Sequence, residues 1–574
     1  GKDLRPESNL EERVSVSFDN TAEARMRGDF AVPTLFNGNF DAVFNPNGLL
    51  RNSLSDAIPG WSQSSPSDSS ATNSGNSANV NLLQQNLVEW SNIGLPLRYR
   101  QGAGYDSSVP NYALKLDSNL KEVTHNPFVI PEWGNLRFDV FSPTKKGKLK
   151  VQLEVEGANI PLKTIDLALD AGTVKENDKQ NVSKIKQTYG DNVNSIGYGR
   201  EGGFETFQLP FQKLSSDEWK KFIGKPAKLT FTLEGNSEVF IDNVFFKSAH
   251  VKLGNPTNAR WDATQDTPTN LLVEKPGYTV SYNTQTKTPN WVSWQVNKTW
   301  TVPRKARLGV QFIDDPFFSL QSSHPNWPEV NGTIFTGLGM DRGHLIPDRD
   351  RNRNAKDTIE TYMGSNLIAQ SMDNNRLFDP DANPVPASAW FNIEKMIGND
   401  VEGGKEYYVV AGSLGNDWSS QKKSNAPELL KEPLNQGYTN PQKFNNNISI
   451  PEWTWKSAIA LPKPGMEITS EAEAFVYITH NHAEPTDNEL PIKHPLNELL
   501  NEERGPIESR EEWREPETWR VGLQQLQDLL NSRKDPQNPE ETDPRFNFQF
   551  DFLSHITDQK VREKLMEDGE YVPF

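Results

Sequence analysis

In the N-terminal half of the chain, apolar and polar residues alternate with a period of two. Over 149–155, Leu, Val, Leu and Val alternate with Lys, Gln and Glu, and the same pattern recurs over 229–233. A period of two puts every second side chain on one face, so each run predicts a strand with one buried face. The apolar run 239–246 predicts a last strand. Strands of this kind, separated by turn-rich segments, are typical of an antiparallel β-sandwich.

The second half mixes β-rich runs with helical periodicity, which predicts an α+β fold. Four runs rich in aromatic and β-branched residues predict strands, the first two joined as a hairpin: 278–282, 291–296, 407–412 and 474–478. A helix is expected at 358–372. Leucines at 523, 526, 529 and 530 predict a final amphipathic helix. The charged, proline-rich stretch 485–516 is interpreted as a long surface excursion.

The segments between these elements indicate where domains begin and end. Residues 1–30 are polar and weakly patterned, and are expected to form an N-terminal arm. The sandwich is predicted at 31–250, with the Ser- and Asn-rich stretch 62–81 as a surface loop. Residues 251–270, rich in Pro, Thr and Asn, are expected to be a linker. The α+β domain is then 271–574, so the chain has two large domains.

The charge balance limits how the chain meets a polyanion. The 60 basic and 77 acidic side chains give a formal net charge of −17, which argues against a protein whose whole surface binds nucleic acid. A polyanionic substrate would have to meet a local basic patch. Between 341 and 356, five basic residues stand against three acidic ones, so this stretch is locally positive. A solvated loop with mixed ion pairs is the alternative interpretation.

Other features exclude whole classes of chemistry. The sequence has no cysteine, so disulfides, thiolate metal sites and a cysteine nucleophile are excluded. It has no run of about 18 apolar residues of the kind that predicts a membrane-spanning helix. The first residues also lack the apolar core of a signal peptide.

The candidate chemistry is concentrated in one stretch. Asp-Arg-Gly-His at 341–344 predicts an imidazole on a tight glycine-containing turn. Asn375 follows His344 by 31 residues, within Asp-Asn-Asn-Arg at 373–376 and one predicted helix away. A neutral imidazole can accept a proton from water, an amide oxygen can bind a hard metal ion, and arginines can bind phosphate. These are the parts needed to cut a phosphodiester with a metal ion, so the residues predict a nuclease.

Five ordered features carry a resemblance to a known family. They are a hairpin Tyr-x-Val-Ser-Tyr-Asn…Pro-Asn-Trp-Val-Ser-Trp, then Asp-Arg-Gly-His, Ser-Asn-Leu-Ile-Ala-Gln, Asp-Asn-Asn and Trp-x-x-x-Glu. In this order they resemble the DNA/RNA non-specific endonuclease family, the ββα-metal nucleases that include the Serratia nuclease. The resemblance covers 271–574 and implies a ββα-metal domain, Mg²⁺ or Mn²⁺ as cofactor, and DNA and RNA as substrates.

The resemblance gives three residues their roles. It implies that His344 is the general base, that Asn375 is the one direct protein ligand of Mg²⁺, and that Glu394 acts on the metal through water. The alternatives are a histidine hydrogen-bonded in a turn and an ordinary turn asparagine, with Asn374 the nearest rival of Asn375. Glu394 follows Asn375 by 19 residues, against about two helical turns in the family. Prolines stop a helix from crossing the insertion 378–388, so we expect the insertion to loop out.

The family also uses arginines around its motif. One lies upstream and stabilises charge on the phosphate in the transition state, and Arg307 is the best match for it, with Arg304 close behind. Another, one helical turn after the glutamate, is absent because Gly398 stands there, and Arg376 or Lys395 is expected to substitute. The arginines near the motif are the candidate substrate-binding residues: Arg342, Arg349 and Arg376.

Two short motifs carry a second resemblance. Asn-Gly-Asn-Phe-Asp at 37–41 and Phe-Ile-Asp-Asn-Val at 240–244 resemble the two ends of jelly-roll carbohydrate-binding-type modules, whose first and last strands are neighbours. A structural Ca²⁺ often lies between those ends, which makes Asn39, Asp41 and Asp242 the candidate ligands. The alternative is that the two aspartates cap turns or pair with lysines. A glycan or cell-surface ligand follows from the analogy of fold alone.

The sequence as a whole predicts a secreted or cell-surface endonuclease that hydrolyses DNA and RNA to 5′-phosphate products. Two alternatives stay open. One is a surface adhesion or glycan-binding protein with a degenerate nuclease domain, and the other is a nuclease toxin or effector. Retained cleavage would exclude the first of them.

Overall fold

The computed structural model of the chain describes residues 38, 40, 60–63, 87–89, 112–132, 134–168, 204–210, 220–261, 268–301, 312, 315–319, 340–352, 355–376, 386–415, 450–535 and 538–569. Most of the loop 62–81 and of the insertion 378–388 lies outside the described residues. So do these predicted features: the arm 1–30, Asn39, Asp41, Arg304 and Arg307.

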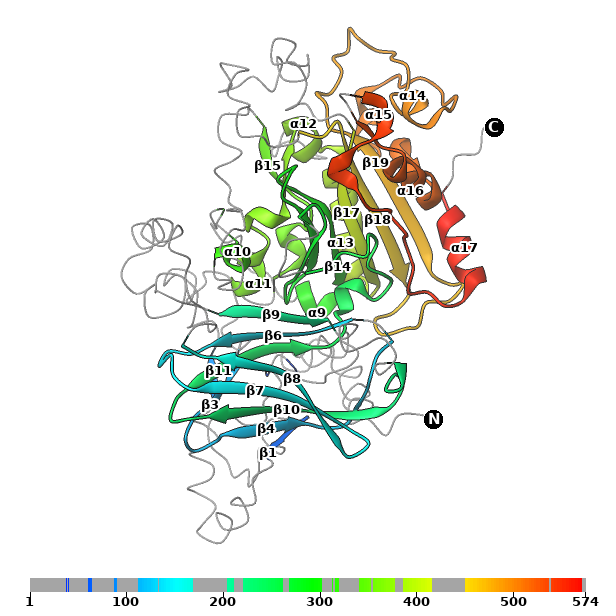
Figure 1. Cartoon of the computed structure of the whole chain (residues 1–574). Coiled ribbons are helices and arrows are strands. Elements are labelled where there is room, and N and C mark those ends of the chain that lie inside the picture. Colours follow the sequence, from blue (N-terminus) through cyan, green and yellow to red (C-terminus); the bar gives the residue numbers. More distant parts are fainter. Residues whose placement is uncertain are drawn as a thin grey trace.

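The N-terminal β unit (residues 38–247) consists of two antiparallel sheets that share one core (Figure 1). One sheet has the order β1-β4-β10-β7-β8 with β5 beside β10, and the other has the order β2-β3-β11-β6-β9. The strands of the first sheet are β1 (Trp61–Gln63), β4 (Glu122–His125), β5 (Phe128–Val129), β7 (Lys148–Val155), β8 (Ala158–Asp166) and β10 (Pro226–Glu234). Those of the second are β2 (Leu87–Glu89), β3 (Tyr112–Leu116), β6 (Asn135–Phe141), β9 (Glu205–Pro210) and β11 (Val239–Phe245).

The predicted alternation of apolar residues accounts for this core. In β7 the four apolar residues of 149–155 are fully buried and alternate with more exposed polar ones. They share a core with Val239 and Ile241 of β11, on the other sheet. All three predicted strands of this half are therefore confirmed, and the period of two is what places their apolar faces between the sheets.

The second half of the chain is built on a seven-stranded antiparallel sheet with the order β12-β13-β14-β17-β18-β19-β20. Its strands are β12 (Leu271–Glu274), β13 (Thr279–Asn283), β14 (Thr288–Val296), β17 (Glu406–Leu414), β18 (Trp453–Leu461), β19 (Glu473–His480) and β20 (Arg520–Val521). The predicted hairpin and both predicted central strands are confirmed. Every residue of β14 and β18 is buried, because helices and loops cover the sheet on both faces.

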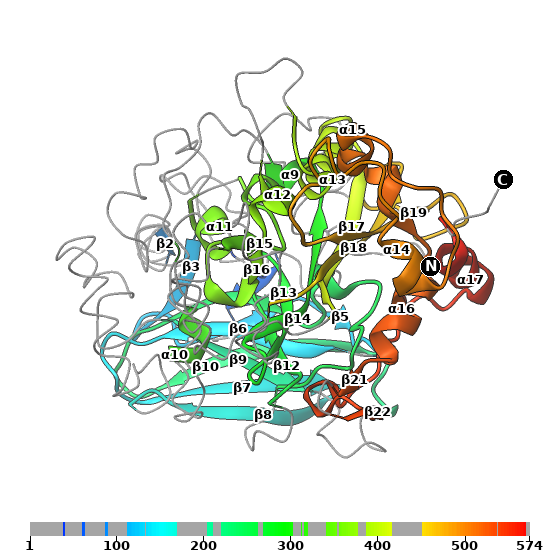
Figure 2. The ribbon, with the colours of Figure 1, turned by 90° about the horizontal axis from the view of Figure 1, so that it is seen from above.

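Helices lie on both sides of this sheet (Figure 2). One side carries α13 (Ala389–Glu402), and the other carries α16 (Leu523–Asn531) and α17 (Gln559–Glu567). The predicted leucine-rich helix is α16, which is thus confirmed. The shorter helices are α9 (Lys298–Thr301), α10 (Pro316–Ser319), α11 (Ala355–Glu360), α12 (Met372–Asn375), α14 (Leu496–Leu500) and α15 (Arg510–Arg514). A small ribbon of β21 (Lys534–Asp535) and β22 (Asn538–Thr542) precedes α17.

The helix predicted at 358–372 is wrong over most of its length. After α11 the chain forms the strand β16 (Leu367–Gln370), which pairs with β15 (Asp341–His344). The buried side chain of Asn366 ends the helical path, since its Nδ2 donates to the carbonyls of Thr361 (2.8 Å) and Ile346 (2.9 Å). All four residues of β16 are buried, which a helix with one buried stripe could not achieve.

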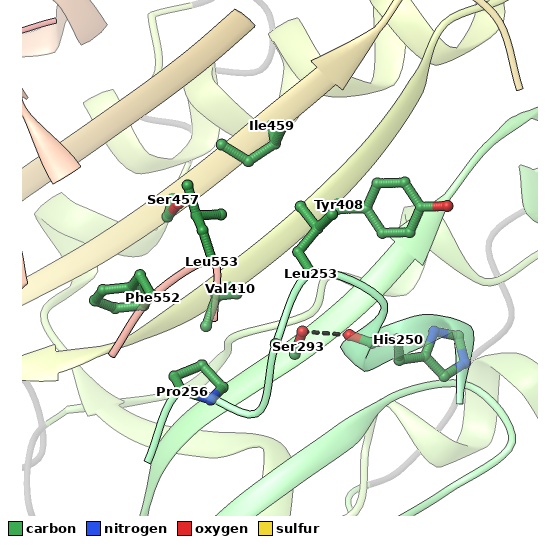
Figure 3. A pocket seen from close by; sticks show the side chains of 11 residues that line it. His250, Leu253, Pro256, Ser293, Tyr408, Val410, Ser457, Ile459, Phe552 and Leu553 are labelled. Carbon is green, nitrogen blue, oxygen red and sulfur yellow. Dashed lines mark hydrogen bonds between the residues drawn. The ribbon is translucent and has the colours of Figure 1, made fainter. Parts of the chain in front are cut away.

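Residues 251–261, the first part of the predicted linker 251–270, pack against the second half of the chain. Val251, Leu253 and Ala259 belong to the apolar core beneath the seven-stranded sheet, and Trp291 Nε1 donates to Thr257 Oγ1 at 2.8 Å. Figure 3 shows Leu253 and Pro256 of this segment beside the strands β14, β17 and β18. Leu253 lines a cavity of about 20 Å³ there. The predicted surface excursion 485–516 is likewise anchored by buried residues of α14 and α15.

The two halves of the chain meet edge to edge. Gln208, fully buried in the outer strand β9, donates from Nε2 to the carbonyl of Leu272 (2.9 Å) and accepts from the backbone N–H of Glu274 (2.7 Å). Its amide therefore bonds the outer strand β12 as a neighbouring backbone would. Arg137 Nε donates to the carbonyl of Glu274 at 2.8 Å, and the same guanidinium pairs with Asp139 at 2.8 Å.

None of the helices among the described residues has the length and apolar character that a bilayer crossing requires.

Candidate active site

His344 is the last residue of β15 and not, as the sequence predicts, part of a tight turn. It pairs with Leu367 in the antiparallel ribbon β15–β16. Its ring meets Tyr362 edge-on with 4.5 Å between ring centroids, and lies 5.5 Å from Phe312. The hydroxyl of Tyr362 donates to Asp348 Oδ2 at 2.9 Å, which fixes that ring. Two aromatic rings therefore hold the imidazole in place.

Gly343, next to the histidine, allows the ribbon to pack closely. A Cβ at this position would overlap the amide of Gln370 and come within 2.6 Å of its Cβ. Gln370 is fully buried, and its Nε2 donates to Asn374 Oδ1. The glycine thus leaves room for a side chain that connects the ribbon to α12, which begins after the N-cap Ser371.

Asn374 and Asn375 have different surroundings. Asn374 is buried, its Nδ2 donates to Thr479 Oγ1 (2.9 Å), and its Oδ1 accepts from Thr454 Oγ1 (3.2 Å). Asn375 is partly exposed, and its Nδ2 donates to Asp341 Oδ2 at 3.0 Å. The bond to Asp341 turns the amide oxygen of Asn375 away from that carboxylate. Of the two, Asn375 is the one whose oxygen can reach a ligand outside the protein.

Asp341 therefore links the ribbon to the end of α12. Besides Asn375, it accepts from Arg376 Nε (2.7 Å) and Nη2 (2.5 Å) in a bidentate pair. The Arg376 side chain is 56% exposed, so the pair lies at the surface. Because one carboxylate fixes both neighbours, the strand that ends at His344 and the residue Asn375 are held in a defined relative position.

The insertion between α12 and α13 begins and ends at the same place. The backbone N–H of Ser388 donates to the carbonyl of Arg376 at 3.1 Å. Ser388 is the N-cap of α13, and its Oγ accepts from the N–H of Phe391 at 3.1 Å. A hydrogen bond therefore joins the residue that ends α12 to the N-cap of α13, independently of the length of the insertion between them.

Glu394 lies on α13 one turn after Trp390, and both face the seven-stranded sheet. Although part of the residue is exposed, burial of its carboxyl is the largest influence on its pKa, which is raised to about 7. The cations of Lys456 and Arg349 oppose this shift, and the nearby carboxylates of Asp350 and Asp348 add to it.

Lys456 of β18 is the buried cation opposite this glutamate. Its side chain is fully buried, with Nζ 4.2 Å from the ring centroid of Trp390. Burial lowers its pKa, while the carboxylates of Glu394 and Asp350 raise it. Asp350 in turn accepts from Trp294 Nε1 at 3.0 Å, and burial raises the pKa of this carboxyl. The sequence did not predict that Lys456 lies beside Glu394 and Asp350, because a lone lysine in an apolar strand belongs to no motif with a recognisable spacing.

The candidate arginines occupy three different settings. Arg349 lies against α13, with Cζ 5.8 Å from the ring centroid of Phe391, and a buried Nη1 that has no hydrogen-bond partner in the part of the chain that is described. Arg342 lies over Phe312 at 5.1 Å. Arg376 is paired with Asp341 as above, and Lys395 is exposed. Arg307 lies outside the described residues.

The proposed calcium ligands are only partly described. Asp242 is fully buried on β11, and its Oδ1 accepts from the N–H of Asn243 at 2.7 Å. The N–H of Val244 donates to the carbonyl of Gly38 at 2.8 Å, so the chain near 38 lies beside β11. In the described residues, no three His, Asp or Glu side chains lie close enough together to hold a metal ion. His480 and His482 stack on each other at 4.9 Å between ring centroids, without a third such side chain, among the residues that the structure describes, to complete a metal site.

Comparison with known proteins shows what this part of the chain is similar to. Residues 262–514 match the family model of the DNA/RNA non-specific endonucleases. A nuclease of Nostoc sp. is 32% identical over 218 residues, which span 38% of this chain and 64% of that protein. The human mitochondrial nuclease EXOG is 26% identical over 137 residues, 24% of this chain and 33% of that protein. The chain thus spans between a third and two thirds of these relatives.

Among solved structures, the complex titled "EndoG/EndoGI complex: Mechanism of EndoG inhibition" matches 43% of this chain and 86% of that chain, at 17% identity and a TM-score of 0.28. That likeness is too low to place residues. The second half of this chain is therefore similar in sequence to the DNA/RNA non-specific endonucleases and to proteins named as nucleases.

Proposed function

We propose that the DNA/RNA non-specific endonuclease domain hydrolyses phosphodiesters in DNA and RNA and leaves 5′-phosphate products. The observation that carries this proposal is the contact of Asp341 with Asn375 and Arg376. Through it, one carboxylate holds the candidate ligand of the metal and an arginine beside the strand that ends at His344. The family match at 262–514 independently supports the same reaction.

The residues present fit Mg²⁺ or Mn²⁺. The bond between Asn375 Nδ2 and Asp341 turns the amide oxygen of Asn375 away from that carboxylate, and amide oxygen is a hard ligand that these ions accept. Glu394 would hold water of the hydrated ion, which is the role of an outer carboxylate. When bound, the ion would supply positive charge to the scissile phosphate and to the departing 3′ oxygen.

His344 would act as the general base. Its imidazole takes a proton from a water molecule as the water oxygen attacks phosphorus, and the bond from phosphorus to the 3′ oxygen breaks. Packing between Tyr362 and Phe312 supports this role, because a base that is fixed in orientation loses no freedom when the substrate arrives.

Arg342, Arg349 and Arg376 would bind the phosphates on either side of the cleaved bond, and Arg307 would stabilise charge in the transition state. Contacts to phosphates carry no sequence information, so we expect little sequence preference. For the same reason activity should fall steeply as salt is raised, since each phosphate contact releases counterions.

For the N-terminal β unit we propose a jelly-roll module with a structural Ca²⁺ at Asn39, Asp41 and Asp242, and a glycan or cell-surface ligand. The neighbouring positions of Gly38 and Val244 support this arrangement. A secreted or cell-surface setting is part of the same proposal. If thermal unfolding is the same in Ca²⁺ and in chelator, for the protein and for Asp242→Asn alike, the calcium site is excluded.

The deciding experiment compares the full chain with His344→Ala on supercoiled plasmid and on single-stranded RNA, in Mg²⁺ and in EDTA. Cleavage of both substrates should require Mg²⁺ and disappear in the variant. His482→Ala is the matched control, because His482 is also partly exposed but lies outside the ribbon. An intact plasmid at low salt in Mg²⁺ and in Mn²⁺ would overturn the proposal and favour a degenerate nuclease domain.

A further inference from the structure

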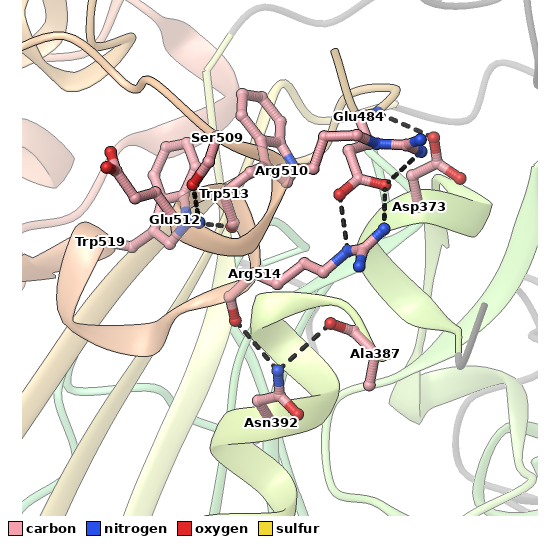
Figure 4. Close-up of polar contacts among 10 residues, drawn as sticks. All are labelled: Asp373, Ala387, Asn392, Glu484, Ser509, Arg510, Glu512, Trp513, Arg514 and Trp519. Carbon is pink, nitrogen blue, oxygen red and sulfur yellow. Dashed lines mark hydrogen bonds and ion pairs between the residues drawn. The ribbon is translucent and has the colours of Figure 1, made fainter. Parts of the chain in front are cut away.

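The two helices that carry Asn375 and Glu394 are connected by residues far along the chain. Figure 4 shows Glu484 between Asp373 of α12 and Arg514 of α15, with Asn392 of α13 below Arg514. Of these residues, Arg514 belongs to the stretch 485–516 that composition predicts to be a surface excursion, and Glu484 directly precedes that stretch. The contacts of Glu484 and Arg514 reach both helices of the candidate site.

On the α12 side, the contacts are made by residues that follow β19. The N–H of Glu484 donates to Asp373 Oδ2 at 2.8 Å. The side chain of Asn481 accepts from the N–H of Ser371 at 2.6 Å, and its Nδ2 donates to the carbonyl of Ala369 at 3.0 Å. The short helix is therefore held at its N-cap and in its first turn.

The carboxylate of Glu484 then meets two arginines of α15. It accepts from Arg514 Nε (2.7 Å) and Nη2 (3.1 Å), and from Arg510 Nη2 (3.0 Å). The Glu484 side chain is 2% exposed, so this ion pair lies where water screens little. Among the described residues, removal of Arg514 would leave this buried carboxylate with Arg510 alone, through a single hydrogen bond.

On the α13 side, the link ends two residues from Glu394. Asn392 Nδ2 donates to the carbonyl of Arg514 at 3.0 Å and to that of Ala387 at 3.2 Å. A continuous path thus runs from Asp373 through Glu484 and Arg514 to Asn392. It crosses from one helix to the other without using the insertion.

We propose that Glu484 and Arg514 form a brace that sets the position of Asn375 relative to Glu394. They are positioning residues for the metal, and this inference rests on the function proposed above. The brace is needed because α12 has only four residues, too few to keep its own orientation. The insertion also means that chain continuity does not fix one helix on the other, apart from the single bond between Ser388 and Arg376.

The test compares Arg514→Met and Arg514→Lys with the unaltered chain. In the methionine variant, the Mg²⁺ concentration for half-maximal cleavage should rise about tenfold, since loss of an outer partner of a metal site weakens binding by roughly that factor or more. The rate at saturating Mg²⁺ should fall less. Calorimetry with Mn²⁺ gives a readout without turnover, and should show the same weakening. The lysine variant, which keeps the charge, should recover part of the loss.

Arg137→Met is the matched control. Arg137 also forms a buried pair with a carboxylate, at 2.8 Å from Asp139, but in the N-terminal β unit. The Arg137→Met variant should have a lower melting temperature, and its Mg²⁺ concentration for half-maximal cleavage should be unchanged. If Arg514→Met behaves like this control, with a lower melting temperature but an unchanged metal midpoint, the brace is purely structural and the inference is overturned.

A second measurement separates the brace from the proposed function. Amide hydrogen exchange over 371–376 should become faster in Arg514→Met, while exchange in α16 stays as it was. If the unaltered chain cleaves neither DNA nor RNA and binds no Mn²⁺, the proposed function is overturned. Hydrogen exchange over 371–376 then tests by itself whether the brace holds α12 in place. Equal protection of 371–376 in both proteins would overturn the brace.

Discussion

The guanidinium of Arg349 lies against the Cα of Gly398. A Cβ at position 398 would be 3.6 Å from Cζ and 3.6 Å from Nε of Arg349. The DNA/RNA non-specific endonuclease family, as the sequence resemblance implies, has an arginine at this point of the helix, one turn after the glutamate. Here an arginine from the segment after β15 is in contact with the position where that side chain would begin. We therefore expect Arg349, and not Arg376 or Lys395, to substitute for the missing arginine.

Arg349→Ala should lower kcat about 100-fold, because it removes a cation that faces Glu394 and would face the phosphate. Plasmid cleavage at saturating Mg²⁺ measures the effect. Adding Gly398→Arg to this variant should restore part of the rate, since the space is then empty. Lys405→Ala, which removes a partly exposed cation from the loop before β17, is the control. Full activity of Arg349→Ala would show that this arginine has no role in the reaction.

The sequence predicted local features of the fold well, and long-range ones poorly. Strands such as β7 could be predicted because a period of two is visible within seven residues. The helix expected at 358–372 failed because residues 367–370 are buried by pairing with β15, and no local pattern reports that pairing. The contact of Glu484 with Asp373 could not be predicted, since the two residues are 111 positions apart. Arg349 is also far along the sequence from Phe391 and Gly398, so its setting could not be predicted from a local pattern.

Gly343→Ala should disrupt the ribbon that carries His344. The added methyl overlaps Gln370, which is buried and has no room to move. Overpacking of this kind costs about 1–3 kcal/mol and should shift the histidine as well. Thermal unfolding and cleavage should both be impaired. Gly505→Ala is the control, because nothing lies within 4 Å of a Cβ there. If Gly343→Ala is as stable and active as the control, the close packing of the ribbon is not required.

Gln208→Ala should destabilise the contact between the two halves of the chain. It leaves the carbonyl of Leu272 and the N–H of Glu274 without their partner, and each unpaired buried group costs about 1–3 kcal/mol. The melting temperature should fall, and cleavage should be lost at a lower temperature. Gln152→Ala on β7, where the side chain is partly exposed, should change neither. Unchanged melting of Gln208→Ala would mean that the Gln208 contact contributes nothing to the stability of the chain.

Stability should fall as the pH drops from about 6.5 toward 4, in part because of His494. Its Nδ1 accepts from the N–H of Leu496 (3.1 Å), so the neutral ring donates from Nε2 to the carbonyl of Thr518 (2.8 Å). Burial lowers the pKa of His494 from 6.5 to about 4. Below pH 6.5, His494 is therefore protonated in the unfolded chain but stays neutral in the folded chain. The free energy of unfolding decreases as the pH falls, until the pH reaches the pKa of His494 in the folded chain. At one pKa unit per 1.36 kcal/mol, the loss is up to about 3 kcal/mol.

Urea unfolding at pH 7.0, 5.5 and 4.5 measures this effect. His494→Gln, which keeps a donor for Thr518 but cannot be protonated, should be less stable at pH 7 and lose less stability on acidification. The matched control is His482→Gln, since His482 is partly exposed. This variant should keep the pH dependence of the unaltered chain. If His494→Gln and the unaltered chain lose equal stability between pH 7.0 and 4.5, the acid sensitivity arises from other groups.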